Sequence, residues 1–293
     1  MKLVTIIPFA KNAGLEVLTY FSAQEVPLGA IVGAPLRKKT IKGIVIEVAD
    51  VELNKSEIKR SDFQLKKITE VYGSLPLSSA YKETIKKIGA EYAVGTSLIW
   101  NSLIPKSILV QVAKLAQTKT KKGEKKTSLI KRNGHTALQT SFAERISFYK
   151  TYIRESFAKK ESVHIVVPNI KDIEVLAKLL EKGIAEYIVT FSSKVAEKKQ
   201  SANIAKFIYP KKASHPIVII STPPFLVLER SDVATVIIES ESSRSYKMIA
   251  RPYLDMRDFV ETYAKDSNKK LIYADTLLSV KKKKKINNKE IEP

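Results

Sequence analysis

The sequence contains no cysteine. This absence excludes disulfide bonds and zinc sites built from thiolates. Only three histidines occur, His135, His164 and His215, and they are scattered along the chain, so we predict no metal site. Long apolar runs are missing too: no stretch reaches the roughly 18 residues of a membrane span, and the apolar start of the chain breaks too early for a signal peptide. We therefore expect a cytoplasmic protein with no membrane partner.

Acidic side chains are few relative to basic ones, and the net charge is +21. Over half of this excess lies in two short segments. Residues 111–135 carry eight basic side chains and one acidic one, and residues 281–293 carry six and two. Both segments lack the apolar residues needed to fold alone, so we predict a basic linker over 111–140 and a disordered basic tail over 281–293. Lysine-rich segments favour a polyanionic partner, and without an amphipathic anchor we favour nucleic acid over membrane.

The predicted linker separates two parts with different sequence patterns. Residues 3–72 form short β-rich runs punctuated by turn residues, and a helical pattern follows over Ser78–Ala93. After the linker, continuous apolar strands alternate with amphipathic helices, which is typical of a parallel sheet covered on both faces. We predict an α/β protein with a β-rich domain over 1–110 and an α/β lobe over 141–280.

Four segments of the N-terminal part occur in a recognisable order: LTYF (18–21), PLGAIVGAPLRKKTIKGIVIEV (27–48), LKKITEV (65–71) and GAEYAVGTSLIWNSLIP (89–105). This ordered set resembles the 3′-DNA-binding domain of the primosomal protein N′ family, the replication-restart helicase PriA. In that family the domain holds the 3′ end of a DNA strand, as at an arrested fork. The resemblance covers about the first 105 residues.

The resemblance implies a pocket for the terminal nucleotide, formed by Leu18, Thr19, Tyr20, Leu36, Arg37, Lys38, Lys39 and Lys66. A tyrosine can stack on an unpaired base, and basic side chains at a turn can contact phosphates. The alternative interpretation is structural, with Tyr20 as a core aromatic and the lysines as a solvated face. Thr19 stands where the family usually has an acidic residue, so a hydroxyl replaces a carboxylate that could accept from a 3′-OH.

The second part resembles, more distantly, the first RecA-like (P-loop-type) lobe of the same helicase family. The matching segments are IVIISTPPFL (217–226), VIIESESSRSYK (236–247) and YADTLLS (273–279). Within the second segment Ser245, Tyr246 and Lys247 follow the family's motif. A RecA-like lobe implies a nucleotide site, and its residues can be checked one by one.

The phosphate-binding loop of that site is altered. Such a loop needs glycines that let backbone amides wrap the anion, then a lysine and a hydroxyl. The pattern Gly-x-x-x-x-Gly-Lys-Ser/Thr occurs nowhere in the chain, and Glu144, Arg145 and Ile146 stand where Gly-Lys-Thr belongs. We expect a buried carboxylate at Glu144 to repel a triphosphate.

The metal-binding half of the site is altered as well. Glu239 replaces the aspartate that orders magnesium, and Ser240 replaces the glutamate that polarises the attacking water. Glu241 lies one residue late, on the opposite face of an extended chain. The chain also ends soon after residues 273–279, where a second lobe would follow. We therefore predict a degenerate lobe with no catalytic residues, no cofactor and no enzyme activity.

Together these patterns predict a DNA-binding protein that recognises single-strand 3′ ends or forks in replication restart or repair, with other replication proteins as further partners. Two alternatives stay open. A partner protein could complete an ATPase or helicase across the ESES edge (239–242), or the lysine runs alone could attach the chain to RNA or the ribosome.

Overall fold

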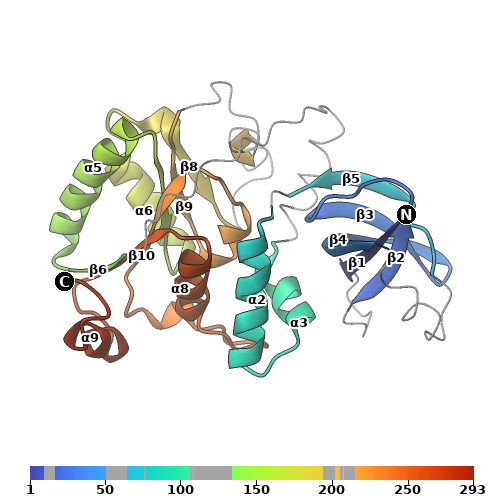
Figure 1. Ribbon diagram of the computed structural model, residues 1–293. Helices are drawn as coiled ribbons and strands as arrows, with labels where there is room; N and C mark the ends of the chain where they lie inside the picture. The colour runs from blue at the N-terminus through green and yellow to red at the C-terminus, as the bar shows by residue number, and fades with distance from the viewer. Residues whose placement is uncertain are drawn as a thin grey trace.

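The computed structural model describes residues 1–9, 17–50, 65–75, 77–105, 108, 134–193, 202–204, 207 and 215–293. Within these residues the chain forms two sheets with helices beside and between them (Figure 1). One sheet is antiparallel, and the other is parallel and covered by helices. This confirms the predicted fold class, a β-rich domain followed by a RecA-like α/β lobe.

The antiparallel sheet has the strand order β2-β1-β4-β3-β5. Its strands are β1 (Lys2–Pro8), β2 (Leu18–Ser22), β3 (Ala30–Leu36), β4 (Lys39–Asp50) and β5 (Glu70–Ser74). The segment before β5 returns to β2, because Phe21 N donates to Lys66 O at 3.0 Å and Ile68 N donates to Phe21 O at 3.1 Å. The sheet thereby closes on itself around a small apolar core that includes Val4, Val32 and Ile68.

Two helices follow this sheet, α2 (Ser79–Glu91) and α3 (Thr96–Leu103). Helix α2 begins after Ser78, whose hydroxyl accepts from Tyr81 N at 3.1 Å and so satisfies one of the free amides of the first turn. The buried residues Tyr81, Ile85 and Ile88 recur at helical spacing. They confirm the helix predicted over Ser78–Ala93.

The parallel sheet has the order β6-β11-β10-β7-β9-β8. Its strands are β6 (His135–Gln139), β7 (Ser162–Val166), β8 (Ile188–Phe191), β9 (Val218–Ser221), β10 (Val233–Glu239) and β11 (Lys270–Asp275). Strands β7, β9 and β10 are buried along their whole length, as expected for a sheet covered on both faces. Helices α5 (Phe142–Ala158) and α6 (Ile170–Leu180) pack on one face, and α8 (Met256–Asp266) packs on the other. None of the described helices has the length and apolar content that a membrane span requires.

The helices α2 and α3 join the two sheets rather than belonging to the first alone. The ring of Tyr81 in α2 is fully buried and lies 5.5 Å from Trp100 of α3, and 5.6 and 5.8 Å from Phe259 and Tyr263 of α8, measured between ring centroids. These separations suit favourable edge-on and tilted contacts. One apolar core therefore runs from the N-terminal sheet to the parallel sheet, with α2 between them (Figure 1).

Two predicted segments differ from expectation. Strand β6 lies inside the predicted linker over 111–140, so the last part of that segment belongs to the parallel sheet. The predicted disordered tail over 281–293 is largely a helix, α9 (Val280–Asn287), and the following residues pair with β6 through Ala137 N to Glu292 O and Glu292 N to His135 O. Residues 111–133 lie outside the described residues, and the other domain boundaries stay predictions.

Candidate functional sites

The residues of the predicted strand-end pocket come from three segments that meet at the N-terminal sheet. Leu18, Thr19 and Tyr20 lie on β2, and Lys66 is adjacent, since its carbonyl accepts from the amide of the next β2 residue. Leu36 ends β3, Arg37 and Lys38 form the turn, and Lys39 starts β4. The hydroxyl of Tyr20 donates to Pro35 O at 3.1 Å and ties β2 to the end of β3. Segments far apart in the sequence are thus joined in one region.

Tyr20 does not suit the stacking role that we expected. Its side chain is 4% exposed and belongs to the core of the N-terminal sheet with Val4, Val32 and Val45. Burial also raises the pKa of its phenol, which therefore stays neutral and donates. A ring enclosed in this way cannot offer a face to an unpaired base, so the structural interpretation of Tyr20 is the correct one.

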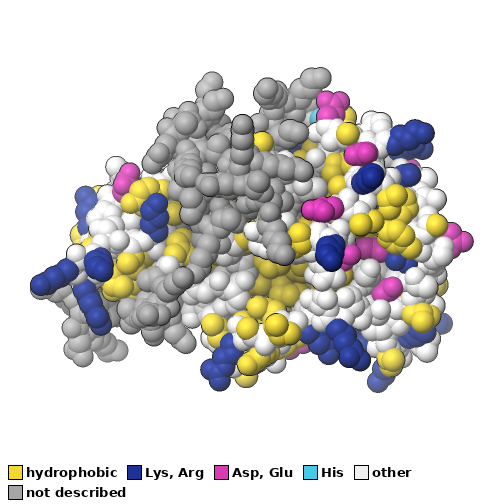
Figure 2. Space-filling model, turned by 180° about the vertical axis from the view of Figure 1, so that it is seen from behind, with side chains coloured by type: hydrophobic (Ala, Val, Ile, Leu, Met, Phe, Trp, Pro, Cys, Tyr) yellow, Lys and Arg dark blue, Asp and Glu magenta, His cyan; other side chains and the backbone are white. Residues whose placement is uncertain are grey.

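The basic residues of the region are exposed. Arg37, Lys38, Lys39 and Lys66 all lie on the surface. Figure 2 shows Lys and Arg side chains gathered at its left, on the N-terminal part of the molecule. Arg37 has a φ of 54°, a left-handed conformation that costs a non-glycine residue about 1 kcal/mol. The turn therefore keeps an arginine at a position where glycine would be less strained.

A second polar cluster lies where β10 ends. Arg145, on the first turn of α5, donates from Nε and Nη2 to Oε1 of Glu239 at 3.1 and 2.8 Å. The hydroxyl of Tyr149, one turn further along α5, donates to the other oxygen, Oε2. Arg145, Tyr149 and Glu239 are 3%, 0% and 2% exposed. Both carboxylate oxygens of Glu239 are thus bound by side chains of this chain.

The surroundings fix the charges of this cluster. Burial alone would lower the pKa of Arg145, but the hydrogen bonds and the charge of Glu239 raise it. Burial and the same carboxylate raise the pKa of Tyr149 well above its ordinary value. The guanidinium therefore stays charged and the phenol stays neutral, so both remain donors.

Glu144 differs from the prediction. It is exposed rather than buried, and its carboxylate accepts from Ser141 N at 3.1 Å and Ser141 Oγ at 2.8 Å, completing a capping box at the start of α5. Hydrogen bonds from Thr140 and Ser141 lower the pKa of this carboxyl. Glu144 thus caps the start of α5, and the buried carboxylate that we expected at this position is not found.

The other predicted nucleotide-site residues also have structural partners. Ile146 is 7% exposed and packs in the core between α5 and the sheet. Ser240 has a φ of 53° and places its Oγ 3.4 Å from Glu239 Oε1. Glu241 is buried, and its two oxygens accept from the amide and the hydroxyl of Ser279, each at 2.8 Å, at the start of α9. A carboxylate there stabilises the helix end.

A magnesium–nucleotide complex does not fit these residues as they stand. Its metal would need a free carboxylate, yet Glu239 is bonded to Arg145 and Tyr149, and Glu241 is bonded to Ser279. The structure therefore brings together only some of the residues that the sequence suggested for the nucleotide site. Glu239 meets Arg145, whereas Glu241 belongs to a different contact.

The sequence interpretation missed the pairing of Arg145 with Glu239. The sequence did contain a signal for it. Both halves of the site depart from the family's motifs, with the cationic Arg145 in the phosphate-loop half and the acidic Glu239 in the metal-binding half. A buried charge is tolerated only with a partner, so two such residues in facing positions predict each other.

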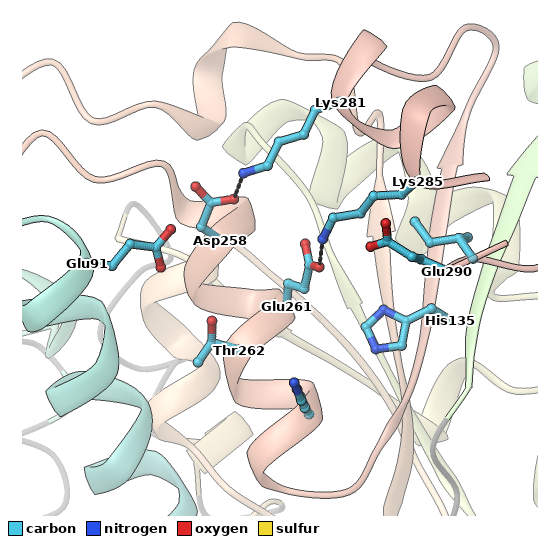
Figure 3. Close-up of a pocket in the computed structure, with 10 residues that line it drawn as sticks. Glu91, His135, Asp258, Glu261, Thr262, Lys281, Lys285 and Glu290 are labelled. Atoms are coloured by element: carbon cyan, nitrogen blue, oxygen red, sulfur yellow. Dashed lines mark hydrogen bonds and ion pairs between the residues drawn. The ribbon is translucent and has the colours of Figure 1, made fainter. Parts of the chain in front are cut away.

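A pocket of about 480 Å³ lies beside α8 and α9, away from that cluster. Its charged residues pair across it: Lys281 Nζ lies 2.6 Å from Asp258 Oδ1, and Lys285 contacts Glu261 (Figure 3). Glu91 at the end of α2 lines its other side. These two ion pairs join α8 to α9, and the residues that line the pocket do not single out a ligand.

The histidines are not grouped. His164 is buried on β7 with Nε2 2.8 Å from Ser221 Oγ, and burial lowers its pKa to about 3. The ring of His215 stacks on Tyr187 with centroids 3.6 Å apart. Within the described part of the chain, no cluster of three or more His, Asp or Glu side chains is placed to hold a metal ion.

No protein-family model matches the chain. Among curated proteins, the replication restart protein PriA of two Helicobacter pylori strains is similar to it, in each case 23% identical over 248 residues. The chain is distantly related to PriA. The match covers 82% of this chain and 38% of each PriA sequence, so the chain spans well under half the length of these relatives.

The relationship to PriA corrects one prediction. We expected a protein with no enzyme activity, but similarity to a replication-restart helicase over most of this chain points to an enzyme family. The altered loop, the altered carboxylate motif and the position of the chain's end after residues 273–279 had led to the opposite prediction.

Proposed function

We propose that the chain is a replication-restart protein that binds DNA at single-strand 3′ ends or forks through its N-terminal sheet. The observation that carries this proposal is the meeting of three separate segments, where Tyr20 Oη donates to Pro35 O and Lys66 lies against β2. The exposed basic turn of Arg37 and Lys38 lies at the end of the same strand, β3. The distant relationship to PriA supports the same conclusion.

The chemistry of this surface fits a strand terminus. Arg37, Lys38, Lys39 and Lys66 supply donors and positive charge for the terminal phosphates. Lysines near phosphates release counterions, so binding through them weakens steeply as salt rises. With Tyr20 inside the core, contact with the last sugar falls to the exposed atoms of Thr19 and Leu18 beside it. Other replication proteins are further proposed partners, on the strength of the PriA relationship.

The test compares forked DNA with a free and a blocked 3′ end, at two salt concentrations. We expect wild type to prefer the free end and Lys66→Ala to lose affinity at both salts. Lys178→Ala is the matched control, because it removes the same charge from an exposed residue of α6 in the other lobe. Equal affinity for free and blocked ends in wild type would contradict the proposed pocket.

A third variant examines end selectivity directly. Thr19→Asp supplies a carboxylate that can accept from a terminal 3′-OH, so we expect a larger preference for the free end. Single-stranded RNA of the same length serves as competitor. If RNA competes as well as DNA and the preference is unchanged in Thr19→Asp, the lysine-driven alternative is favoured instead.

A further inference from the structure

A lysine and a tyrosine meet over strand β3, which lies between β4 and β5 in the sheet (Figure 1). Lys42 on β4 pairs with Gly33 on β3, and Lys42 Nζ lies 4.4 Å from the ring centroid of Tyr72 on β5. The neighbours of Gly33, Val32 and Ala34, face the small apolar core. Because side chains alternate along a strand, Gly33 and its partner Lys42 face the opposite, outer side of the sheet.

The missing side chain of Gly33 makes room for this contact. A Cβ there would lie 2.5 Å from Thr69 Oγ1 and 3.2 Å from Tyr72 Oη, so glycine leaves the space over β3 to the ring of Tyr72. Burial raises the pKa of the Tyr72 phenol, and the charge of Glu70 raises it further. The phenol therefore stays neutral, and the face of its ring attracts the ammonium of Lys42.

The charge of Lys42 can serve an anion from outside. Lys42 is exposed, and among the residues that the structure describes it forms no ion pair with a carboxylate. Other lysines at this sheet are paired: Lys2 Nζ lies 2.6 Å from Asp50 Oδ1, at the far end of β4. Lys82 Nζ of α2 lies 3.1 Å from Glu47 Oε1 on the same strand. Within the described ranges, positive charge is thus balanced near the end of β4 and unbalanced at Lys42.

Lys42 also lies along the strand that leads away from the basic turn. It follows Lys38 by four residues, which is about 13 Å along an extended strand. We propose that Lys42 contacts a backbone phosphate of a DNA strand whose 3′ end is held near this turn, and that Tyr72 positions the ammonium for the contact. An ammonium already held over a ring loses less freedom on binding. This inference rests on the proposed function, DNA binding by the N-terminal sheet.

The first experiment measures binding of a fork with a free 3′ end over a salt series. We expect Lys42→Ala to bind more weakly than wild type and to lower the slope of log affinity against log salt by about 0.7, the value for one phosphate contact on a single strand. Lys2→Ala is the matched control, because it removes the same charge from a lysine that is already paired with Asp50. Its slope should equal that of wild type.

Variants of Tyr72 distinguish positioning from charge. Tyr72→Leu keeps an apolar side chain but removes the ring face, so we expect weaker binding, to which Lys42→Ala adds no further loss. Tyr72→Phe keeps the ring and should bind DNA like wild type. Additive losses of Tyr72→Leu and Lys42→Ala would overturn the positioning role.

A third measurement requires no Tyr72 variant and replaces the phosphates of the fork, one at a time, by neutral methylphosphonates. We expect one linkage near the 3′ end at which the replacement weakens binding by wild type but not by Lys42→Ala. The absence of such a linkage would overturn the proposal, and so would equal salt slopes of Lys42→Ala and wild type. If these results came with a wild-type preference for free over blocked 3′ ends, the Lys42 contact alone would be wrong. A wild type without that preference would instead contradict the proposed pocket, and the slopes would still decide on Lys42.

Discussion

The hydroxyl of Tyr92 donates to Asp258 Oδ2 at 2.7 Å and accepts from Asp255 N at 3.2 Å, which links the end of α2 to the start of α8. Asp258 Oδ1 in turn binds Lys281 of α9. Burial and the nearby carboxylate of Asp258 raise the pKa of Tyr92, so its proton is retained. The phenol of Tyr92 therefore connects the end of α2 with α8, and Asp258 extends this link to α9.

Replacing Tyr92 by Phe tests this link. The change removes the hydrogen-bond partner of Asp258 Oδ2 and of the Asp255 amide, so we expect the free energy of unfolding to fall by about 1–2 kcal/mol. Urea denaturation measures it. Tyr253→Phe is the control, because that side chain is 61% exposed, and we expect it to change little. Equal stability of Tyr92→Phe and wild type would show that the link contributes nothing.

The contact between α8 and α9 predicts an acid-sensitive stability. Glu261 accepts from Lys282 and Lys285, and although burial opposes ionisation, the lysines lower its pKa to about 2. The folded pKa lies below the unfolded one, so the contribution is present above about 4.5 and is lost as pH falls toward 2. We expect Glu261→Gln to cost on the order of 3 kcal/mol near neutral pH. The difference from wild type should shrink as the pH approaches 3, and a constant difference would contradict this assignment.

The sequence predicted the two sheets because their patterns are local. Short β-rich runs separated by turn residues mark the first sheet, continuous apolar strands such as β10 mark the second, and the spacing of Tyr81, Ile85 and Ile88 marks α2. The sequence did not predict α9, because a segment with five consecutive lysines and few apolar residues is expected to be disordered. The helix is stabilised by contacts of Lys282, which is 1% exposed. Its Nζ lies 4.2 Å from the ring centroid of Tyr273 and binds Glu261, and both partners are distant in the sequence.

The candidate sites also contain some features that the local sequence predicts and others that depend on tertiary contacts. The exposure of Arg37, Lys38 and Lys66 could be expected from the sequence, because turns and surface charges are local features, whereas their role in DNA binding was implied by the resemblance and stays a proposal. The burial of Tyr20 and the pairing of Arg145 with Glu239 depend on which strands become neighbours. No local pattern contains that information.

Gly43 on β4 marks a close approach of strands. A Cβ there would lie 2.8 Å from Ile6 Cδ1 and 2.9 Å from the backbone oxygen of Ile7. The side chain can move but the carbonyl cannot, so we expect Gly43→Ala to destabilise the protein by about 2 kcal/mol. Ile6→Val in the same background removes Cδ1, and part of the loss should return. Denaturation midpoints of the single and double variants measure both effects. If Ile6→Val restores no stability to Gly43→Ala, the clash with the Ile7 carbonyl accounts for the whole loss.

Variants of basic residues on α9 and in the β3–β4 turn distinguish binding at the proposed site from non-specific electrostatic attraction of DNA. Deleting 281–293 would not do so, because it also removes the contacts of Lys282 and Lys285 with Glu261 and would destabilise the lobe. Lys283 and Lys284 are exposed, so replacing both by Ala removes two charges and should leave the fold intact. Arg37→Ala with Lys38→Ala removes the same charge from the proposed site.

We expect the Arg37/Lys38 variant to lose its preference for a free 3′ end and to reduce the salt dependence by about two phosphate contacts. The Lys283/Lys284 variant should keep the preference, because α9 packs on the lobe and makes no part of the N-terminal sheet. Binding of an end-labelled fork over a salt series measures both quantities. If the two variants lost affinity and free-end preference equally, the net charge of the protein and not the position of Arg37 and Lys38 would determine DNA binding.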